Sequence, residues 1–270
     1  MHPREPSETP PYKEVRGLTR ELEILRALNR LPGGIGSTSE LARLCQLDRT
    51  TTKRLLETLR HLGLVRPSDR DGQYNLTFDV RSLSEGFEDE AWVGKVARPT
   101  MQAAARELMW PCDLATAEAG FMVVRESTHR WSALSQHRAM IGERLPMLVT
   151  AIGRAYLEAC DEVEREGLLE LMRRRTDWIG EQARDQAMVD RLLRETRRRG
   201  YSLNEGEWLR EADFAAIAVP VFAGPRLLAA INMVFPKSAI APRDLQARYL
   251  PMLQRMAETF GKDSRRWIEA

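Results

Sequence analysis

Apolar residues recur every three or four positions in three successive segments of the first third of the chain, and this pattern predicts three amphipathic helices. The first helix is expected over 18–30, with a leucine stripe that starts at Leu18 and Leu22. The Pro- and Gly-rich segment 32–36 ends it, because these residues interrupt regular helical structure.

The next two helices are short and a tight turn separates them. Residues 37–39 are Ser, Thr and Ser and supply an N-cap for the second helix, while Asp48 is the N-cap of the third. Gly63 is the expected left-handed residue after the third helix. Two strands at 64–66 and 73–78 complete a winged helix-turn-helix.

The remaining two thirds mix both periodicities, which predicts an α+β domain with a sheet backed by helices. Two almost continuously apolar strands, 214–223 and 227–235, indicate that at least one of them lies at the centre of the sheet. The other expected strands are 113–119, 121–126 and 131–137, and the expected helices are 99–109, 151–159, 162–174, 186–199 and 243–261.

Four segments follow from these patterns. Residues 1–11 are rich in proline and form an expected disordered tail, and 12–79 form the winged helix-turn-helix domain. The acidic, amphipathic stretch 80–95 predicts a linker helix, and 96–270 form the second domain. No apolar run is long enough to cross a membrane and the first residues lack the apolar core of a secretory signal, so we expect a cytoplasmic protein.

The overall composition does not indicate a function, but the net charge differs between the two predicted domains. The net charge of the 270 residues is only +2, which by itself does not indicate a nucleic-acid partner. Residues 12–81 carry 13 Lys and Arg against 9 Asp and Glu, a formal +4 that leaves −2 for the rest. The three cysteines are far apart and show no metal-ligand spacing, so we expect reduced thiols.

The third helix carries the chemistry expected of a DNA-recognition helix. Side chains near the N-terminus of a helix in the major groove reach base edges, where Arg49 can pair with guanine and threonines can contact bases or phosphates. Basic residues around it can neutralise phosphates. The candidate DNA contacts are Arg16, Arg20, Ser39, Arg49, Thr50, Thr51, Thr52, Lys53, Arg54, Arg66 and Arg70.

Two other interpretations remain open for this helix. It can be a solvated amphipathic helix of a small helical domain, although three consecutive threonines are poor helix formers and an exposed face selected for stability would favour Glu, Lys or Ala. The wing can also serve contacts between proteins.

Several dispersed segments resemble the IclR family of bacterial transcriptional regulators over nearly the full length of the chain. They are VRGLTRELEILRAL, LDRTTTKRLLETL, VRSLSEGF and RLPMLVTAIGRAYL. The resemblance implies a winged-helix domain, a linker helix and a ligand-sensing domain of GAF-like fold. It also implies pairing into homodimers or tetramers and control by small organic acids, often aromatic.

The resemblance places an effector pocket between the sheet and the loop that leads into the helix after Arg-Leu-Pro. Carried over by position, its wall contains Leu134, His137, Leu145, Ala151, Asn204, Phe214, Asn232 and Val234, to which Arg138 and Gly153 are added on chemical grounds. Family members that bind small polar acids carry small hydroxylated residues on the last strand. Asn232 and Val234 stand in that strand here, which favours a larger, flatter ligand than glyoxylate.

The pocket residues suit an aromatic acid. The helix start at Ala151 and Gly153 offers backbone amides to a carboxylate, and His137 or Arg138 can pair with it. Leu145 and Phe214 pack against a ring, and the two asparagines can bond a ring hydroxyl. Each has a structural alternative: His137 as a hydrogen-bonding group of the fold, Phe214 as core, and Asn232 as the partner of a buried polar neighbour.

The sequence therefore predicts a ligand-responsive regulator rather than an enzyme. No nucleophile elbow, phosphate loop or metal-spaced His or Cys is found, although Glu126, His129 and His137 are weighed as a metal site. We expect no cofactor and no metal. The expected partners are operator duplex DNA, a small aromatic carboxylate, RNA polymerase and a second copy of the chain, with no membrane. We expect an activator of a catabolic operon; the alternative is a repressor that senses a different small organic acid.

Overall fold

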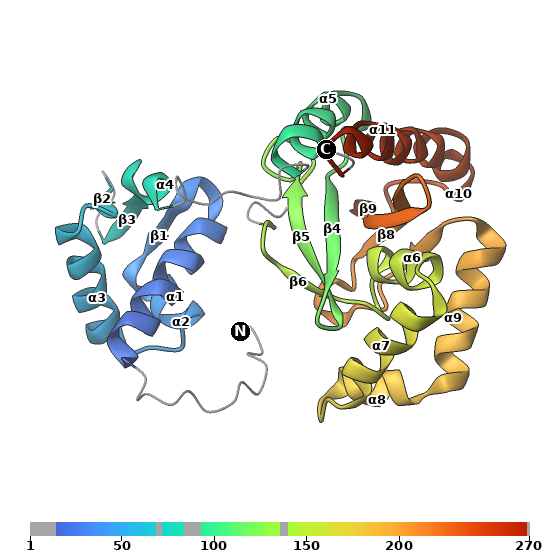
Figure 1. Cartoon of the computed structure of the whole chain (residues 1–270). Helices are drawn as coiled ribbons and strands as arrows, with labels where there is room; N and C mark the ends of the chain where they lie inside the picture. The colour runs from blue at the N-terminus through green and yellow to red at the C-terminus, as the bar shows by residue number, and fades with distance from the viewer. Residues whose placement is uncertain (1–14, 69–71, 84–92, 136–139, 269–270) are drawn as a thin grey trace. The chain divides into compact units, whose positions relative to one another are not determined.

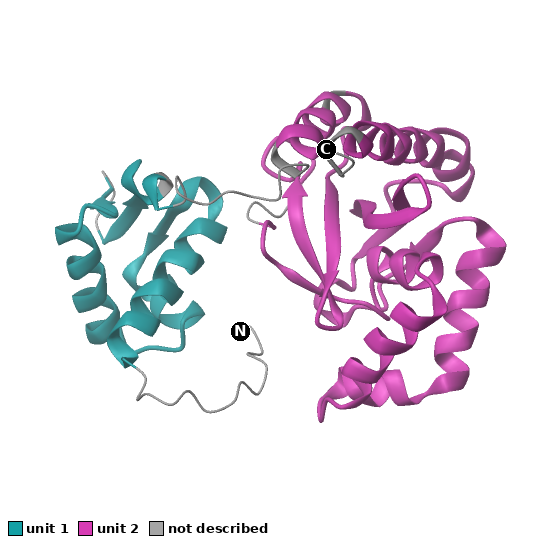
Figure 2. Ribbon diagram, viewed as in Figure 1, with its two compact units in different colours: residues 1–88 teal, residues 89–270 magenta. Residues whose placement is uncertain are grey.

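A computed structural model of the whole chain describes residues 15–68, 72–83, 93–135 and 140–268 (Figure 1). The chain divides into two compact units, Met1–Glu88 and Asp89–Ala270, coloured separately in Figure 2. The predicted tail 1–11 and most of the predicted linker helix lie outside the described residues. No described helix is long and apolar enough to span a bilayer.

Unit 1 has the predicted order of helix, helix-turn-helix and wing. Both predicted ends of the third helix are confirmed, because Asp48 caps its N-terminus and Gly63 has a φ of 77°. A strand before the second helix, which the sequence analysis missed, joins the wing in a three-stranded sheet of order β1-β3-β2. The elements are α1 Arg16–Arg30, β1 Ile35–Ser37, α2 Thr38–Leu44, α3 Arg49–His61, β2 Val65–Pro67, β3 Gln73–Leu76 and α4 Asp79–Ser82, with a 3-10 turn at Pro32–Gly34.

The predicted leucine stripe of the first helix is wrong at its N-terminal end. Leu18 and Leu22 are 56% and 44% exposed, while Ile24, Leu25 and Leu28 are buried. The buried positions all lie in the second half of α1, and they join Leu56 and Leu59 of α3 in one core. The helix therefore packs by its second half, which periodicity alone does not reveal.

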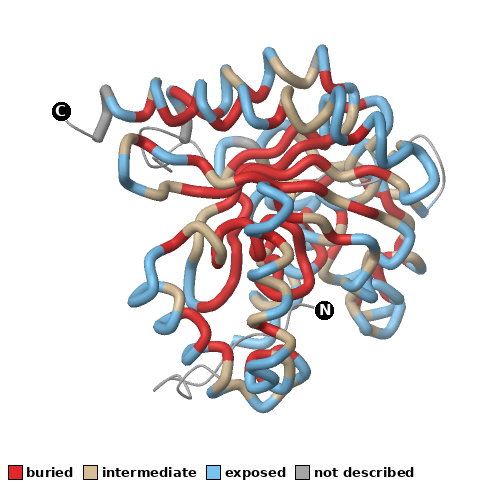
Figure 3. The backbone as a smooth tube through the Cα atoms, turned by 90° about the vertical axis from the view of Figure 1, so that its right-hand side faces the viewer, coloured by how far each residue is buried: buried red, intermediate tan, exposed pale blue. Residues whose placement is uncertain are grey.

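Unit 2 is a six-stranded antiparallel sheet of order β6-β5-β4-β9-β8-β7 with helices on both faces. As Figure 3 shows, burial concentrates along these strands. The prediction that an apolar strand lies at the centre is confirmed, because β9 pairs with both β4 and β8. The strands are β4 Cys112–Glu118, β5 Phe121–Ser127, β6 Arg144–Pro146, β7 Ser202–Asn204, β8 Phe214–Ala223 and β9 Arg226–Pro236.

The helices of unit 2 lie in two layers. One hydrophobic core forms between the sheet and the helices at 93–108 and 242–268, and a second forms between the sheet and the helices from α6 to α9. The helices are α5 Arg98–Leu108, which continues a π-helical turn at Val93–Ala97, α6 Ala151–Ala159, α7 Glu162–Arg173, α8 Trp178–Arg184, α9 Gln186–Arg199, α10 Pro242–Asp244 and α11 Leu250–Ile268. A π-helical segment at Leu245–Tyr249 joins α10 to α11, and a 3-10 turn at Leu209–Glu211 precedes β8.

Alternation along the strands decides which side chains reach the α6 layer. In β9, Ile231 and Met233 belong to the core on the α11 side, so Asn232 and Val234 point to the α6 side. In β4, Cys112 and Leu114 face the α11 side, and Asp113 between them faces α6. Asp113 and Asn232 thus project to the same layer, the one that contains α6.

The α+β fold class is confirmed, but one predicted strand is wrong. Residues 131–135 form turns in which the backbone amides of Trp131 and Ser132 both bond to the carbonyl of Thr128, and 136–139 lie outside the described residues. The strand that follows β5 in the chain is β6, which pairs with β5 on the side opposite β4. The sequence pattern did not predict α8 or β7, because both are too short to show a periodicity.

Candidate functional site

The start of α3 is built by local hydrogen bonds. Oδ1 of Asp48 accepts the backbone N–H of Thr51 at 2.7 Å, and hydrogen bonds from Thr51 lower the pKa of this carboxyl. Arg49 and Thr50 are exposed beside this cap and Thr51 is half-buried. Arg49 and Thr50 at the start of α3 are therefore accessible to a ligand outside the domain.

Thr52, predicted to contact DNA, faces the interior. Its side chain is fully buried and its hydroxyl donates to the carbonyl of Asp48 at 2.9 Å. The position stands four and seven residues before Leu56 and Leu59, which are both buried, so it belongs to the core face of α3. We correct its role from base or phosphate contact to packing.

A shallow groove between α1 and α3 brings several other candidates together. Arg20 of α1 lines it opposite Thr51, Lys53 and Arg54 of α3. Glu21 and Glu57 also line it, so its walls carry both signs of charge. Arg16, Ser39 and Arg66 are exposed elsewhere on unit 1, and Arg70 lies outside the described residues.

The ammonium group of Lys53 forms contacts with other side chains of unit 1. Its Nζ hydrogen-bonds Oη of Tyr74 and lies 3.2 Å from Oε1 of Glu57, and Tyr74 donates to Glu57 in turn. Arg60 donates to the same carboxylate at 2.7 Å. Hydrogen bonds from Tyr74, Arg60 and Lys53, in that order, lower the pKa of Glu57 to about 2. This cluster ties α3 to the wing strand β3.

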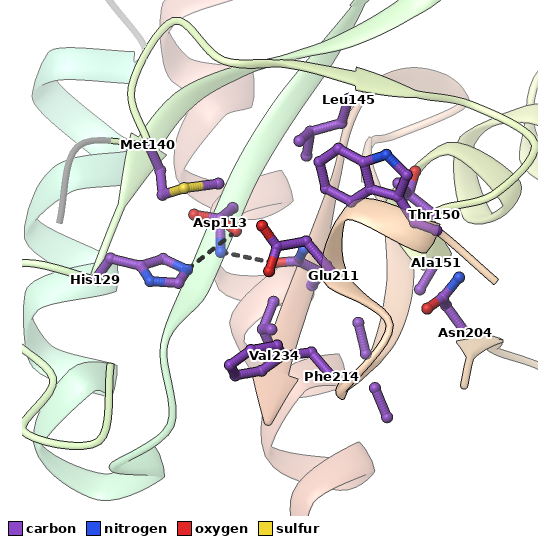
Figure 4. A pocket seen from close by; sticks show the side chains of 14 residues that line it. Asp113, His129, Met140, Leu145, Thr150, Ala151, Asn204, Glu211, Phe214 and Val234 are labelled. Carbon is purple, nitrogen blue, oxygen red and sulfur yellow. Dashed lines mark hydrogen bonds and ion pairs between the residues drawn. The ribbon is translucent and has the colours of Figure 1, made fainter. Parts of the chain in front are cut away.

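The second candidate site is a cavity in unit 2, between the α6 side of the sheet and the segment 205–213 (Figure 4). Its volume is about 60 Å³. One enclosed water needs roughly 10–15 Å³ by this measure, so the cavity holds a few water-sized groups and must widen to admit an aromatic ring. Its wall consists of Asp113, His129, Met140, Leu145, Thr150, Ala151, Asn204, Trp208, Glu211, Phe214, Ala215, Ala216, Asn232 and Val234.

Six of the ten predicted pocket residues line this cavity: Leu145, Ala151, Asn204, Phe214, Asn232 and Val234. Leu134 and Gly153 are not among the lining residues, and Leu134 is 40% exposed. His137 and Arg138 lie outside the described residues.

Gly153 has a packing role. A Cβ at this position would lie 2.3 Å from both Cα and the carbonyl oxygen of Met147, so the glycine allows α6 to approach that backbone. Its N–H is taken by Oγ1 of Thr150, the N-cap of α6. Ala151 is thus the residue of the helix start that faces the cavity.

Asn204 is also held by the protein itself. Its Nδ2 donates to the carbonyl of Val149 and its Oδ1 accepts the N–H of Gly206 at 3.0 Å. Its side chain therefore fixes the loop before α6 against the segment 205–213, rather than offering free groups to a hydroxyl.

Arg154 strengthens the same junction and was missed by the sequence analysis. Its buried guanidinium donates to the carbonyls of Leu148 and Leu203 at 2.7 and 2.9 Å, and Nη1 lies 3.0 Å from Oε1 of Glu207. Burial raises the pKa of Glu207, but Arg154 more than offsets this and the pKa is lowered overall. These bonds fix the segment that carries Trp208 and Glu211 to the cavity wall.

Three buried polar side chains meet at one end of the cavity. Nε2 of His129 lies 3.5 Å from Oδ2 of Asp113, and Oδ1 of Asn232 accepts the backbone N–H of Asp113 at 2.8 Å. Burial alone would raise the pKa of Asp113, yet the neighbouring His129 holds it below the ordinary value. Asn232 is therefore the partner of a buried polar neighbour, one of the two alternatives weighed for it.

Asp113 and His129 were missed as wall residues, although Asp113 gave a signal. An ionisable residue inside an apolar strand segment is costly unless it is paired, so its position in a predicted strand marks it as functional or structurally required. Among the described residues no group of three His, Cys, Asp or Glu is arranged to hold a metal ion.

Both units match models of known protein families. The model of the IclR helix-turn-helix domain matches residues 17–69, and that of the bacterial transcriptional regulator IclR C-terminal region matches residues 89–261. The chain is 26% identical to the HTH-type transcriptional regulator XynR of Escherichia coli K12, over 81% of this chain and 85% of that protein.

Two further relatives are informative. The p-hydroxybenzoate hydroxylase transcriptional activator of Acinetobacter baylyi is 26% identical, over 95% of this chain and 94% of its own length. The crystal structure of an IclR homolog of Microbacterium hydrocarbonoxydans complexed with 4-hydroxybenzoate has a TM-score of 0.59 and 22% identity, and covers 93% of this chain and 99% of that one. With family models matching most of both units, the chain belongs to the IclR family of bacterial transcriptional regulators.

Proposed function

We propose that this regulator senses a small aromatic carboxylic acid, of the hydroxyphenyl class, in the cavity of unit 2 and activates a catabolic operon. The observation that carries the proposal is the division of the cavity wall: an α6 N-terminus at Ala151, an apolar middle and a polar end at Asp113. The amides of a helix N-terminus favour a carboxylate. Leu145 and Phe214 supply apolar surface for a ring.

Relatives support the ligand class. One relative is named for the activation of p-hydroxybenzoate hydroxylase, and one homologous structure holds 4-hydroxybenzoate. Three segments of this chain, YKEVRGLTRELEIL, VVRESTHRWSALSQHRAM and GERLPML, resemble the activator of hydroxyphenylpropionate catabolic genes. The same likeness favours an activator over a repressor.

We propose that unit 1 binds the operator by α3. Arg49 and Thr50 are exposed at its N-terminus, and Arg20 and Arg54 line the groove next to Thr51, so these side chains are available for base and phosphate contacts. Two copies of the chain would read half-sites related by two-fold symmetry, about one helical turn or a multiple apart. An activator of this kind acts in the cytoplasm and contacts RNA polymerase at the promoter.

The small cavity suggests how the ligand would act. Because an aromatic ring enters only when the wall moves apart, the acid binds preferentially to an expanded arrangement of the segment 205–213 and α6. A ligand shifts a conformational equilibrium only through such a difference in affinity. The expanded arrangement would change the spacing of the two recognition helices in the dimer.

The test uses the full chain and a duplex that the protein itself selects from a random pool. Fluorescence anisotropy then measures operator affinity with and without hydroxyphenyl acids, and with short aliphatic acids as the comparison. Trp208 in the cavity wall gives an independent reading, because its emission should change on binding and this change should be absent in Trp208→Phe.

The expected result is binding of at least one hydroxyphenyl acid, together with increased transcription in vitro from a promoter that carries the selected duplex. Binding of short aliphatic acids alone would overturn the aromatic class. A decrease in transcription with the same acid would support the alternative of a repressor.

A further inference from the structure

Asp113 lines the cavity, and one of its carboxylate oxygens can still accept a hydrogen bond. The residue is 1% exposed, and Oδ1 has no hydrogen-bond partner among the described residues. The other oxygen, Oδ2, lies 3.5 Å from Nε2 of His129. An ionised carboxylate can only accept, so this buried oxygen can accept a hydrogen bond from a donor on a molecule that enters the cavity.

The cavity is polarised from end to end. In Figure 4 Asp113 and His129 lie on one side, with Glu211 next to Asp113, while Thr150 and Ala151 lie on the other. The nine-residue helix α6 directs its N-terminus and the positive end of its dipole to the Ala151 side. A carboxylate is thus attracted to Ala151 and repelled by Asp113 and Glu211, which carry the same charge.

We propose that Asp113 determines effector specificity by accepting a hydrogen bond from a ring hydroxyl at the end of the effector opposite its carboxylate. The proposal rests on the proposed function, since it assumes that an aromatic acid occupies this cavity. It adds that the acid must carry a hydrogen-bond donor, and that Asp113 is the residue that accepts from this donor. Asn204, expected from the sequence to bond the hydroxyl, is occupied by the carbonyl of Val149 and the N–H of Gly206.

Neighbouring residues hold Asp113 in position for this role. Its backbone N–H is fixed by Asn232 at 2.8 Å, and both residues lie in paired central strands. His129 is held from its other nitrogen, since Nδ1 lies 2.6 Å from Oγ of Ser135. The acceptor is therefore already oriented before the ligand arrives, and a donor gains the bond without reorganising the sheet.

The experiment compares matched ligands on the full chain by isothermal titration calorimetry. The probes are phenylpropionate, its para- and meta-hydroxy derivatives, and the corresponding fluoro derivatives, which are similar in size to the hydroxy compounds but cannot donate. Wild type should bind the better hydroxy derivative about 10- to 100-fold more tightly than its fluoro counterpart, the factor typical of a hydrogen bond to a charged group.

The variant Asp113→Asn should reduce this preference to a few-fold, while phenylpropionate binds at least as tightly as to wild type. Retained phenylpropionate binding shows that the variant is folded. The matched control Asp244→Asn changes an exposed residue that does not line the cavity, and it should keep the full preference. If Asp113→Asn misfolds, the preference of wild type for hydroxy over fluoro ligands still tests the requirement for a donor.

The outcomes separate the two proposals. If aromatic acids bind wild type with no preference for a hydroxyl, or if Asp113→Asn keeps the preference, the role of Asp113 is overturned and the proposed function stands. If no aromatic acid binds wild type, the proposed function itself is overturned.

Discussion

Oδ1 of Asn232 accepts the backbone N–H of Asp113 across the central strands β4 and β9, with 2.8 Å between the two atoms. The two side chains are 5% and 1% exposed, so water does not replace this bond if it is lost. One amide thus supports both the centre of the sheet and the acceptor at the cavity.

Replacing Asn232 by Leu should therefore destabilise unit 2. The change keeps the shape of the side chain but leaves the buried N–H of Asp113 without a partner, which costs about 1–3 kcal/mol. Urea unfolding followed by circular dichroism measures the loss. The control Asn29→Leu, at an exposed position of α1, should stay within about 0.5 kcal/mol of wild type, and equal stability of both variants would contradict the argument.

The features that the sequence predicted well are those that depend on neighbouring residues. Asp48 and Gly63 mark the two ends of α3 through a local hydrogen bond and a left-handed backbone conformation. The turn at Ala119-Gly120 has the positive φ values that its glycine indicates. Each of these needs only a few residues of context, so a single sequence suffices.

The polar end of the cavity could not be predicted in the same way. The bond between Asp113 and Asn232 joins residues 119 positions apart, and it depends on the register of β4 against β9. His129 comes from turns that were expected to precede a strand. Thr52 is different, since its spacing from Leu56 and Leu59 already marked it as a core position.

Gly153→Ala tests the close approach of α6 to the preceding loop. The added Cβ would lie 2.3 Å from the backbone of Met147, so α6 must move away and the cavity wall with it. We expect a lower melting temperature and loss of effector binding.

Gly167→Ala is the matched control for that change. Gly167 lies in α7, where a Cβ meets nothing within 4 Å, so alanine should stabilise the protein by about 0.4–1 kcal/mol. A tolerated Gly153→Ala with an unchanged melting temperature would show that the loop can yield.

The cluster around Glu57 predicts a pH dependence of unit 1. Because the pKa of Glu57 is lowered to about 2 from 4.5, its stabilising contribution is complete above about pH 4.5 and is lost as the pH falls toward 2. Tyr74→Phe keeps the buried ring but removes the first of the three donors, so the pKa should rise toward 4.5. Titration of the Glu57 carboxyl by NMR measures its pKa in wild type and in the variant. A wild-type pKa near 4.5 would show that the three hydrogen bonds to Glu57 do not form.

The two ends of the threonine-rich segment should respond differently to substitution. Arg49 is exposed at the start of α3, so Arg49→Ala should weaken binding to the selected duplex by about 1–3 kcal/mol if the guanidinium pairs with a base. If it contacts only phosphate, the loss should be similar for all sequences and the slope of log affinity against log salt should decrease by about one.

Thr52→Val is the counterpart inside the domain. Valine keeps the shape of the buried side chain and removes only the hydroxyl that donates to the carbonyl of Asp48, so stability should fall by about 1 kcal/mol. Because Thr52 does not reach the surface, the affinity of the folded protein for the duplex should change by no more than a few-fold in anisotropy titrations. A loss of DNA affinity equal to that of Arg49→Ala, with stability unchanged, would mean that Thr52 turns outward to the bases and that this part of α3 rearranges when it binds.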